Sequence, residues 1–129
     1  MHYSPLFEKC PLEYNPFKAC VGPRPIGWLS TVSPDGIDNL APFSQFNNLS
    51  YDPPLVMVSC NQTTDDAGNV YRKDTVRNIE ATGCFVYNIV PYELREKMNL
   101  TAVGYPPEVD EFEKAGLTKL DSIRVKAKR

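Results

Sequence analysis

The sequence predicts a mainly β fold with short helices, in the form of a small β-barrel with helical additions. Twelve prolines and seven glycines divide the chain into short segments. Several of these segments are rich in β-branched and aromatic residues, and only a few are helically periodic. At 129 residues the chain has the size of one domain. Within it we expect an irregular arm, residues 1–21, and a barrel portion, residues 22–129.

The first two predicted strands form a hairpin. Ile26–Val32 has the composition of a strand, and Ser33–Gly36 follows it with a proline, an aspartate and a glycine, each suited to its place in a turn. Ile37–Pro42 is then expected to return as the partner strand, ending at a proline that cannot donate to the ladder. Leu55–Cys60 is a continuous apolar run, which predicts a strand buried on both faces.

A helix is predicted to begin at Asp74, whose carboxylate suits an N-cap. Val76 and Ile79 fall on one face of this helix. Gly83 can end it, because glycine tolerates the left-handed conformation. Cys84–Val90 follows as another predicted strand.

A second helix is expected after this strand, with Pro91 at its first position. Leu94 and Met98 would share one face of it, and Glu93 is spaced to pair with Lys97. Both features favour a short amphipathic helix.

A third, shorter helix is predicted over Val109–Ala115, ended by Gly116. Beyond it Ile123, Val125 and Ala127 alternate with basic residues, which predicts a strand with one face for burial. Because this strand would begin just where the sequence stops, we expect the barrel to be incomplete at its C-terminal end.

Composition excludes several classes of function. A formal net charge of −2 and a pI near 5.4 provide no domain-wide positive field, so we expect no nucleic-acid partner. The sequence has no apolar run of the roughly 18 residues that a membrane span requires and no basic start with a long apolar run after it. We therefore expect a soluble, cytoplasmic protein without a membrane partner.

Cysteine and histidine content bears on metal and triad chemistry. The single histidine, His2, makes a multi-histidine zinc site or a Ser-His-Asp triad improbable, and we predict no metal site. Cys60 and Cys84 lie in apolar runs and are expected to be buried thiols. A disulfide between Cys10 and Cys20 stays open, because sequence alone cannot establish a pairing.

Three clusters combine polar, charged and aromatic residues in a way that suits a ligand. Each also has a purely structural interpretation, which stays open at this point. The clusters are Arg24–Thr31, Ala41–Ser50 and Arg72–Thr75.

Each cluster has chemistry that could contribute to a ligand site. In the first, Arg24 precedes a strand that carries hydroxyls and could hold a phosphate or a polar ring edge. In the second, amides and hydroxyls alternate with aromatic rings, as in pockets for aromatic ligands with a polar rim. In the third, Lys73 stands at a predicted helix start, where free N–H groups attract anions, although the carboxylate of Asp74 competes for the same donors.

In the structural interpretation, the first cluster is a surface arginine before an ordinary strand and the second is a loop whose side chains cap its own backbone. The third is an ordinary helix start flanked by solvated charges. The chain has neither G-x-G-x-x-G nor G-x-x-x-x-G-K-[ST], so neither a Rossmann site nor a P-loop is indicated.

The order of these segments resembles a known family. The stretch GPRPIGWLSTVSPDGIDNLAPFSQFNNLSYDPPLVMVSCN, followed by RKDTVRNIEATGCFVYNIV, is similar to the flavin reductase-like, FMN-binding split-barrel family from about Gly22 to Val90. MNLTAVGYPPEVDEFEKAGL extends the resemblance to about Leu117. No single motif is decisive, but the ordered set at these spacings is specific.

The resemblance implies a split β-barrel that forms a homodimer and holds FMN at or near the dimer interface. Carried over by position, the residues that would line the flavin and phosphate region are Arg24, Ser30 and Thr31. Those that would meet the isoalloxazine edge and ribityl chain are Ser44, Phe46 and Asn47, and those at the phosphate end are Lys73, Asp74 and Thr75. Trp28 would be core or interface packing. Family members commonly take hydride from NADH or NADPH onto FMN, so no catalytic acid or base is required.

The family continues beyond the position that matches Arg129, which again implies an incomplete barrel in this chain. Two further interpretations stay open beside an NAD(P)H-dependent flavin reductase. One is a flavin-binding or electron-carrying protein without turnover. The other is a truncated barrel that acts only as an interaction module.

Overall fold

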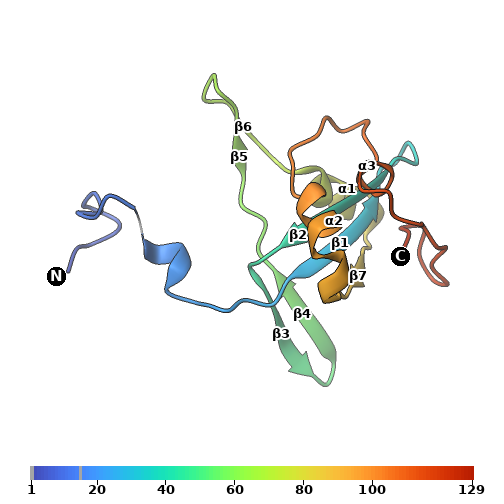
Figure 1. Ribbon diagram of the computed structural model, residues 1–129, viewed down its shortest axis with the longest axis horizontal. Helices are drawn as coiled ribbons and strands as arrows, with labels where there is room; N and C mark the ends of the chain where they lie inside the picture. Colours follow the sequence, from blue (N-terminus) through green and yellow to red (C-terminus); the bar gives the residue numbers. More distant parts are fainter. Residues whose placement is uncertain (1, 15) are drawn as a thin grey trace.

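The computed structural model describes residues 2–14 and 16–129. A three-stranded antiparallel sheet in the order β2-β1-β7 forms the centre of the molecule, and two separate two-stranded hairpins extend from it (Figure 1). The elements are η1 (Pro16–Ala19), β1 (Gly27–Val32), β2 (Asp38–Phe43), β3 (Phe46–Tyr51), β4 (Pro54–Val58), β5 (Thr63–Thr64), β6 (Val70–Tyr71), α1 (Asp74–Thr82), β7 (Val86–Asn88), η2 (Tyr92–Leu94), α2 (Arg95–Leu100) and α3 (Glu111–Lys114).

The β1–β2 hairpin confirms the first predicted pair of strands. Its register runs from Gly27 opposite Phe43 to Val32 opposite Asp38. The turn between the strands closes through the Gly36 N–H, which donates to the Ser33 carbonyl at 3.0 Å. Gly36 has a φ of +87°, which its lack of a Cβ permits. All six residues of β1 are buried, because β1 is the central strand of the sheet.

A compact apolar cluster lies where α2, η2 and α3 pack against the sheet. Trp28, Leu40 and Phe112 form its buried centre, and Leu94 and Met98 pack against them, which confirms their predicted common face. The Trp28 indole N–H donates to Thr101 Oγ1 at 2.9 Å. This bond satisfies the one polar group of a side chain that is otherwise surrounded by carbon.

Helix α1 packs against the sheet through polar side chains. The predicted Val76 and Ile79 are half-buried, whereas Thr75 and Asn78 lie on the fully buried face. Gly83 ends the helix with a φ of +70°, as predicted. The sheet presents hydroxyl and amide groups here, so the helix places matching polar groups against them.

The β3–β4 hairpin corrects the expectation for Leu55–Cys60. That run was predicted to be buried on both faces, but β4 pairs with β3 in a two-stranded ribbon, and Leu55 and Met57 are 49% and 40% exposed. Figure 1 shows the ribbon projecting away from the central sheet. Apart from Phe46, which is buried at the start of β3, the apolar residues of the ribbon are exposed or half-buried.

The C-terminal segment corrects the expectation of a strand that begins near Ile123. Residues 120 to 129 form a loop that closes through two backbone bonds of 2.9 Å between Leu120 and Arg129. Ala127 is completely buried, whereas Ile123 is 91% exposed. The alternation of side chains therefore does not mark a sheet face, and the segment folds back over β1, where the Ser30 hydroxyl donates to the Lys128 carbonyl.

Several helix and strand ends differ from prediction. The strand predicted over Cys84–Val90 is shorter, as β7, and Pro91 precedes η2 as its N-cap instead of lying within a helix. The predicted partner of Glu93, Lys97, donates to the Gly116 carbonyl at 2.6 Å.

Helix α3 is also shorter than Val109–Ala115, because the Asp110 side chain accepts from the Phe112 N–H at 2.9 Å and so begins the helix at Glu111. Gly116 follows with a φ of +60°.

The four cysteines are free thiols, so Cys10 and Cys20 do not form a disulfide in this structure. Cys60 and Cys84 are half-buried, less than expected. Burial raises the pKa of the Cys60 thiol, and the positive charge of Lys73 partly offsets this. Across residues 2–14 and 16–129, no helix is long and apolar enough to cross a bilayer.

A close contact at the start of β1 gives a first testable prediction. A Cβ on Gly27 would lie 2.4 Å from Phe46 Cδ2, whereas a Cβ on Gly104 would meet nothing within 4 Å. We expect Gly27→Ala to lower the free energy of unfolding by about 1–3 kcal/mol, because Phe46 is buried and must shift. Gly104→Ala, the control, should change it by less than about 0.5 kcal/mol. Urea unfolding measures the change in both variants. A change for Gly27→Ala as small as that for Gly104→Ala would show that the Phe46 ring can move aside at little cost.

Candidate functional site

Two pockets adjoin the C-terminal end of β2. The first, which we call the lysine pocket, has a volume of about 310 Å³ and is bounded by β2, the β5–β6 hairpin, the start of α1, the loop 101–105 and α3. The second, the arginine pocket, has about 490 Å³ and lies between the arm, residues 44–47 and β4. Phe43 lines the first pocket and Ser44 the second, so the chain passes directly from one to the other.

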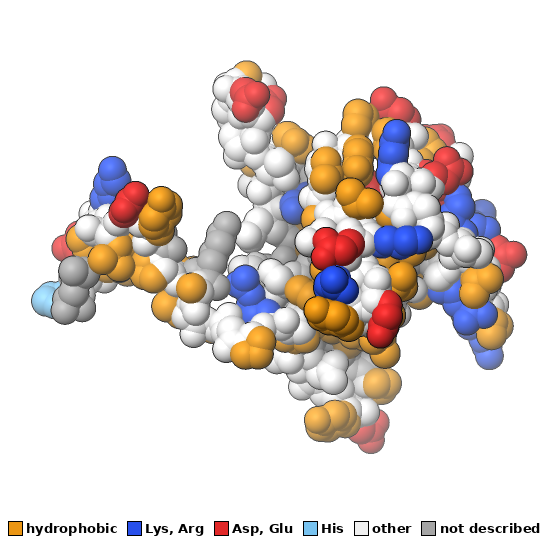
Figure 2. Space-filling view, viewed as in Figure 1, with side chains coloured by type: hydrophobic (Ala, Val, Ile, Leu, Met, Phe, Trp, Pro, Cys, Tyr) orange, Lys and Arg blue, Asp and Glu red, His pale blue; other side chains and the backbone are white. Residues whose placement is uncertain are grey.

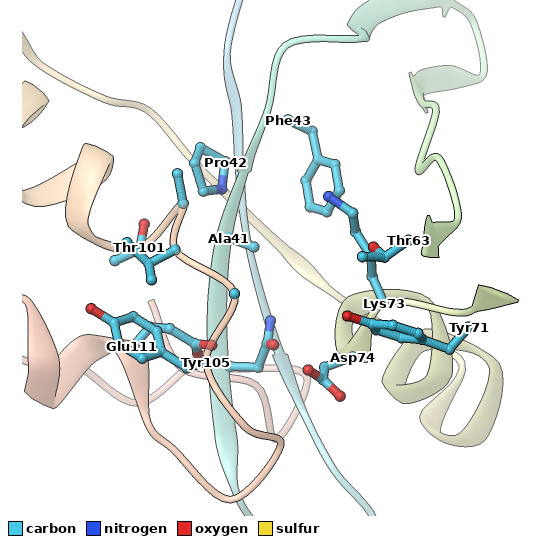
Figure 3. A pocket seen from close by; sticks show the side chains of 14 residues that line it. Ala41, Pro42, Phe43, Thr63, Tyr71, Lys73, Asp74, Thr101, Tyr105 and Glu111 are labelled. Carbon is cyan, nitrogen blue, oxygen red and sulfur yellow. The ribbon is translucent and has the colours of Figure 1, made fainter. Parts of the chain in front are cut away.

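The lysine pocket has two chemically different walls (Figure 3). On one side lie the side chains of Phe43, Tyr71 and Lys73, and on the other those of Tyr105 and Glu111. The Lys73 ammonium stands 5.5 Å from the centroid of the Phe43 ring, within the range of a cation–π contact. The pocket therefore offers aromatic surface and a positive charge at the same place.

The start of helix α1 opens onto the lysine pocket. Lys73 occupies the N-cap position with extended backbone, and its side chain makes no capping hydrogen bond. The prediction of Asp74 as the N-cap is wrong: Asp74 is the first helical residue, and its carboxylate pairs with Arg77. Because Arg77 engages this carboxylate, the first-turn N–H groups and the helix dipole keep their attraction for an anion.

Thr75 lies beneath this helix start and faces the sheet. It is buried, and its hydroxyl accepts from Asn39 Nδ2 at 3.1 Å. Asn39 belongs to β2 and also lines the lysine pocket. The bond therefore ties the first turn of α1 to the strand that forms the floor of the pocket.

The arginine pocket brings together four of the predicted binding residues, Arg24, Ser44, Phe46 and Asn47. The Phe46 ring packs against Tyr87, with their centroids 4.6 Å apart. Figure 2 shows hydrophobic side chains gathered on the arm and on the projecting β3–β4 hairpin, the two parts of the chain that flank this pocket. The arginine pocket is therefore the more apolar and more exposed of the two.

Ser30 and Thr31 occupy a different position. Both are completely buried in β1 and line neither of these pockets. Besides its bond to the C-terminal segment, Ser30 Oγ accepts from Asn88 Nδ2 at 3.3 Å. Thr31 Oγ1 accepts from Asn78 Nδ2 at 3.1 Å. In the structure their hydroxyls bind protein groups and hold the sheet, α1 and the C-terminal segment together.

Glu111 was not among the predicted site residues. It is 6% exposed, lines the lysine pocket, and accepts from the Leu40 N–H through Oε2 at 2.9 Å. Burial raises the pKa of the Glu111 carboxyl, the Leu40 N–H lowers it, and the nearby carboxylates of Asp74 and Asp110 raise it further. An acidic residue in a first helical turn is common at the surface, so the sequence pattern alone gave no reason to place this one inside a pocket.

No group of three or more histidine, cysteine, aspartate or glutamate side chains that could hold a metal ion occurs in the described part of the chain.

The fold and the two pockets define a split-barrel protein whose candidate site is lined by aromatic side chains, Lys73 and Arg24. The model of the flavin reductase like domain matches residues 22–128, and the chain belongs to this family. Over 109 residues the chain is 52% identical to an uncharacterised protein of Aquifex aeolicus, covering 84% of this chain and 54% of that protein. An uncharacterised protein of Bacillus subtilis is 36% identical over 112 residues, covering 87% of this chain and 52% of that protein.

Solved structures confirm the predicted fold class, mainly β with short helices in a split barrel. Nitrilotriacetate monooxygenase component B from Bacillus cereus superposes with a TM-score of 0.84 at 30% identity, covering 100% of this chain and 61% of that one. A 2-nitrobenzoate 2-nitroreductase from Pseudomonas fluorescens superposes with a TM-score of 0.79 at 28% identity, covering 100% of this chain and 59% of that one. Flavoredoxin of Desulfovibrio vulgaris superposes with a TM-score of 0.70, covering 100% of this chain and 60% of that one. At 21% identity this similarity shows the fold alone.

The chain spans about half the length of the curated relatives it matches.

The contact between Asn39 and Thr75 gives a second testable prediction. Thr75→Val keeps the shape of the side chain but leaves the buried Asn39 amide without this acceptor. We expect the free energy of unfolding to fall by about 1–3 kcal/mol. The control Thr64→Val lies on the exposed β5 and should change it by less than about 0.5 kcal/mol. Chemical denaturation of both variants checks this, and an unchanged midpoint for Thr75→Val would contradict it.

Proposed function

We propose that this chain binds FMN between the lysine pocket and the adjoining arginine pocket and acts as a flavin reductase-like oxidoreductase that takes electrons from NADH or NADPH. The observation that carries the proposal is the position of Lys73. It stands at the uncapped start of α1 and beside the Phe43 ring, so one pocket offers a phosphate site and an aromatic wall.

The phosphate end of FMN fits the start of α1. Helix α1 has nine residues, so its dipole and the N–H groups at its start favour an anion there. Lys73 adds a full positive charge, and Asp74 is turned toward Arg77. Thr75 takes part indirectly in this proposal, by holding the helix start against β2 through Asn39.

The ring end of FMN fits the aromatic surface beside Lys73. Phe43 and Tyr71 line the lysine pocket, and the next residue along the chain, Ser44, turns into the arginine pocket. We assign Ser44, Phe46 and Asn47, with Arg24, to the outer edge of the ring system, where hydroxyl, amide and guanidinium groups can bond its polar atoms.

Ser30 and Thr31 are assigned a supporting role, because both are buried among protein partners. They fix β1 and α1, and thereby the position of the pocket.

Bound FMN would supply the redox chemistry by accepting hydride from a nicotinamide and passing electrons to an acceptor. The chain's own residues bind and orient the flavin. The open arginine pocket leaves access to the second reactant. This fits the absence of a Rossmann fingerprint from the sequence, since a nicotinamide can stack on the flavin without a nucleotide domain of its own.

Titration of the purified chain with FMN, followed by flavin fluorescence and absorbance, tests binding. Stopped-flow reduction of the loaded protein by NADH and by NADPH then separates a reductase from an electron carrier without turnover. A chain that takes up no FMN at micromolar concentration would contradict the proposal and favour an interaction module.

The phosphate assignment predicts a difference between two ligands. Lys73→Ala should weaken FMN binding by about tenfold or more and leave riboflavin binding nearly unchanged, because riboflavin lacks the phosphate. Arg72→Ala is the control: Arg72 is adjacent but pairs with Glu80. Isothermal titration with both ligands measures the effect, and an equal loss for FMN and riboflavin would place Lys73 away from the phosphate.

We also propose that the chain forms a homodimer through the β3–β4 hairpin. Leu49, Leu55 and Val56 are exposed on this projecting ribbon, and apolar surface of this kind commonly marks an interface. A second copy is the occupant that the family resemblance implies. A partner there would also cover the arginine pocket, since Met57 of β4 lines it.

Sedimentation velocity over a concentration series checks the dimer. Leu55→Lys should shift the protein to a monomer, because it places a charge in the proposed interface. Leu100→Lys is the control, because Leu100 is 48% exposed, close to the 49% of Leu55, but lies on α2 outside the hairpin. It should leave the dimer intact. A wild-type monomer that still binds FMN would refute this part of the proposal.

A further inference from the structure

One buried ionisable group in the lysine pocket has no part in the function proposed above. Glu111 lies across the pocket from Lys73 (Figure 3). At 6% exposure it is a carboxyl group shielded from water, and it lines a pocket. A carboxyl is rarely buried in this way without a partner or a task.

We propose that Glu111 is a ligand-contacting residue of the lysine pocket, which in its protonated form donates a hydrogen bond to a polar atom of the bound ligand and in its ionised form weakens the binding of anions. This inference rests on the proposed function, for which the ligand is FMN. It adds a specific residue to that function and a dependence of FMN affinity on pH.

The hydrogen-bond geometry defines how the carboxyl can act. Leu40 N–H donates to Oε2 at 2.9 Å, which fixes the carboxyl plane against β2. The N–H of Glu111 itself also interacts with the carboxyl and favours its ionised form. The carboxyl is thus held at the wall of the lysine pocket, where it can meet a ligand. When protonated, it can donate to a ring carbonyl or a ring nitrogen, and when ionised it can only accept.

The charges around Glu111 decide which form prevails. Asp74 on α1 and Asp110 before α3 both favour the protonated form, whereas the Leu40 N–H on β2 favours the ionised form. Asp110 is itself engaged by Lys119, which also reaches Asp38 on β2. Lys73, Tyr71 and Tyr105 line the same pocket, and Lys73 lies on the wall opposite Glu111 with its ammonium group over the Phe43 ring (Figure 3).

Ligand binding should shift this balance further. FMN brings a phosphate that carries up to two negative charges and excludes water from the pocket, and both effects disfavour a carboxylate. By linkage, a ligand that raises the pKa of Glu111 binds more tightly when the residue is protonated. FMN affinity should therefore be highest at low pH and fall as pH rises through the pKa of Glu111 in the free protein.

The test compares wild type with Glu111→Gln, which keeps an acceptor for the Leu40 N–H but has no charge to lose. Wild type should lose FMN affinity by about tenfold per unit of ligand-induced pKa shift as pH rises, whereas Glu111→Gln should lose much less over the same range. Glu113→Gln, on the exposed side of the same helix, is the control and should follow wild type. Urea unfolding of each variant verifies that it is folded.

A second measurement needs no variant. Carbon-13 NMR of glutamate-labelled wild type, titrated with pH in the presence and absence of FMN, should show the Glu111 carboxyl moving to a higher pKa on FMN binding, with exposed carboxyls unmoved. A Glu111 resonance unaffected by FMN, or equal pH dependence of FMN affinity in wild type and Glu111→Gln, would overturn the role of Glu111 while leaving FMN binding intact. Absence of FMN binding by wild type at every pH would instead overturn the proposed function, and this inference with it.

Discussion

Two buried amide–hydroxyl hydrogen bonds fix α1 against the sheet, and the position of the candidate site depends on them. Asn78 donates to Thr31 on β1, and Asn39 of β2 donates to Thr75, both at 3.1 Å. A polar group buried without its partner costs about 1–3 kcal/mol, so each bond makes one placement of the helix strongly preferred. Apolar contacts alone would allow the helix to slide, whereas these bonds also set where its N-terminus points.

That placement connects the core to the pocket. Asn39 is at once the donor to Thr75 and a wall of the lysine pocket, and the strand that carries it continues through Phe43 into the arginine pocket at Ser44. Gly27 opposite Phe43 lets the Phe46 ring lie directly on β1. Both pockets are therefore built on one continuous segment of chain whose backbone is fixed by the central hairpin.

The parts of the fold that follow from local chemistry could be predicted from the sequence. The turn at Gly36 and the end of α1 at Gly83 depend on positive φ, which glycine alone adopts freely. What depends on distant partners could not. Leu55 is exposed because its strand pairs only with β3 in a ribbon outside the central sheet. The strand predicted from the alternation of Ile123, Val125 and Ala127 was wrong for the same reason. The segment is held by the Ser30 hydroxyl, which donates to the Lys128 carbonyl, and by the burial of Ala127.

The candidate site shows the same division. The clusters were predicted because they combine residue types that suit a ligand, whereas Glu111 was not among them because its inward position is fixed by the Leu40 N–H on another element. Its effect on the site is electrostatic. Lys73 contributes one positive charge to the lysine pocket, and the negative charge of Asp74 is opposed by Arg77. An ionised Glu111 would add a negative charge to the pocket that Lys73 lines and make it less attractive to an anion, whereas a protonated Glu111 would not.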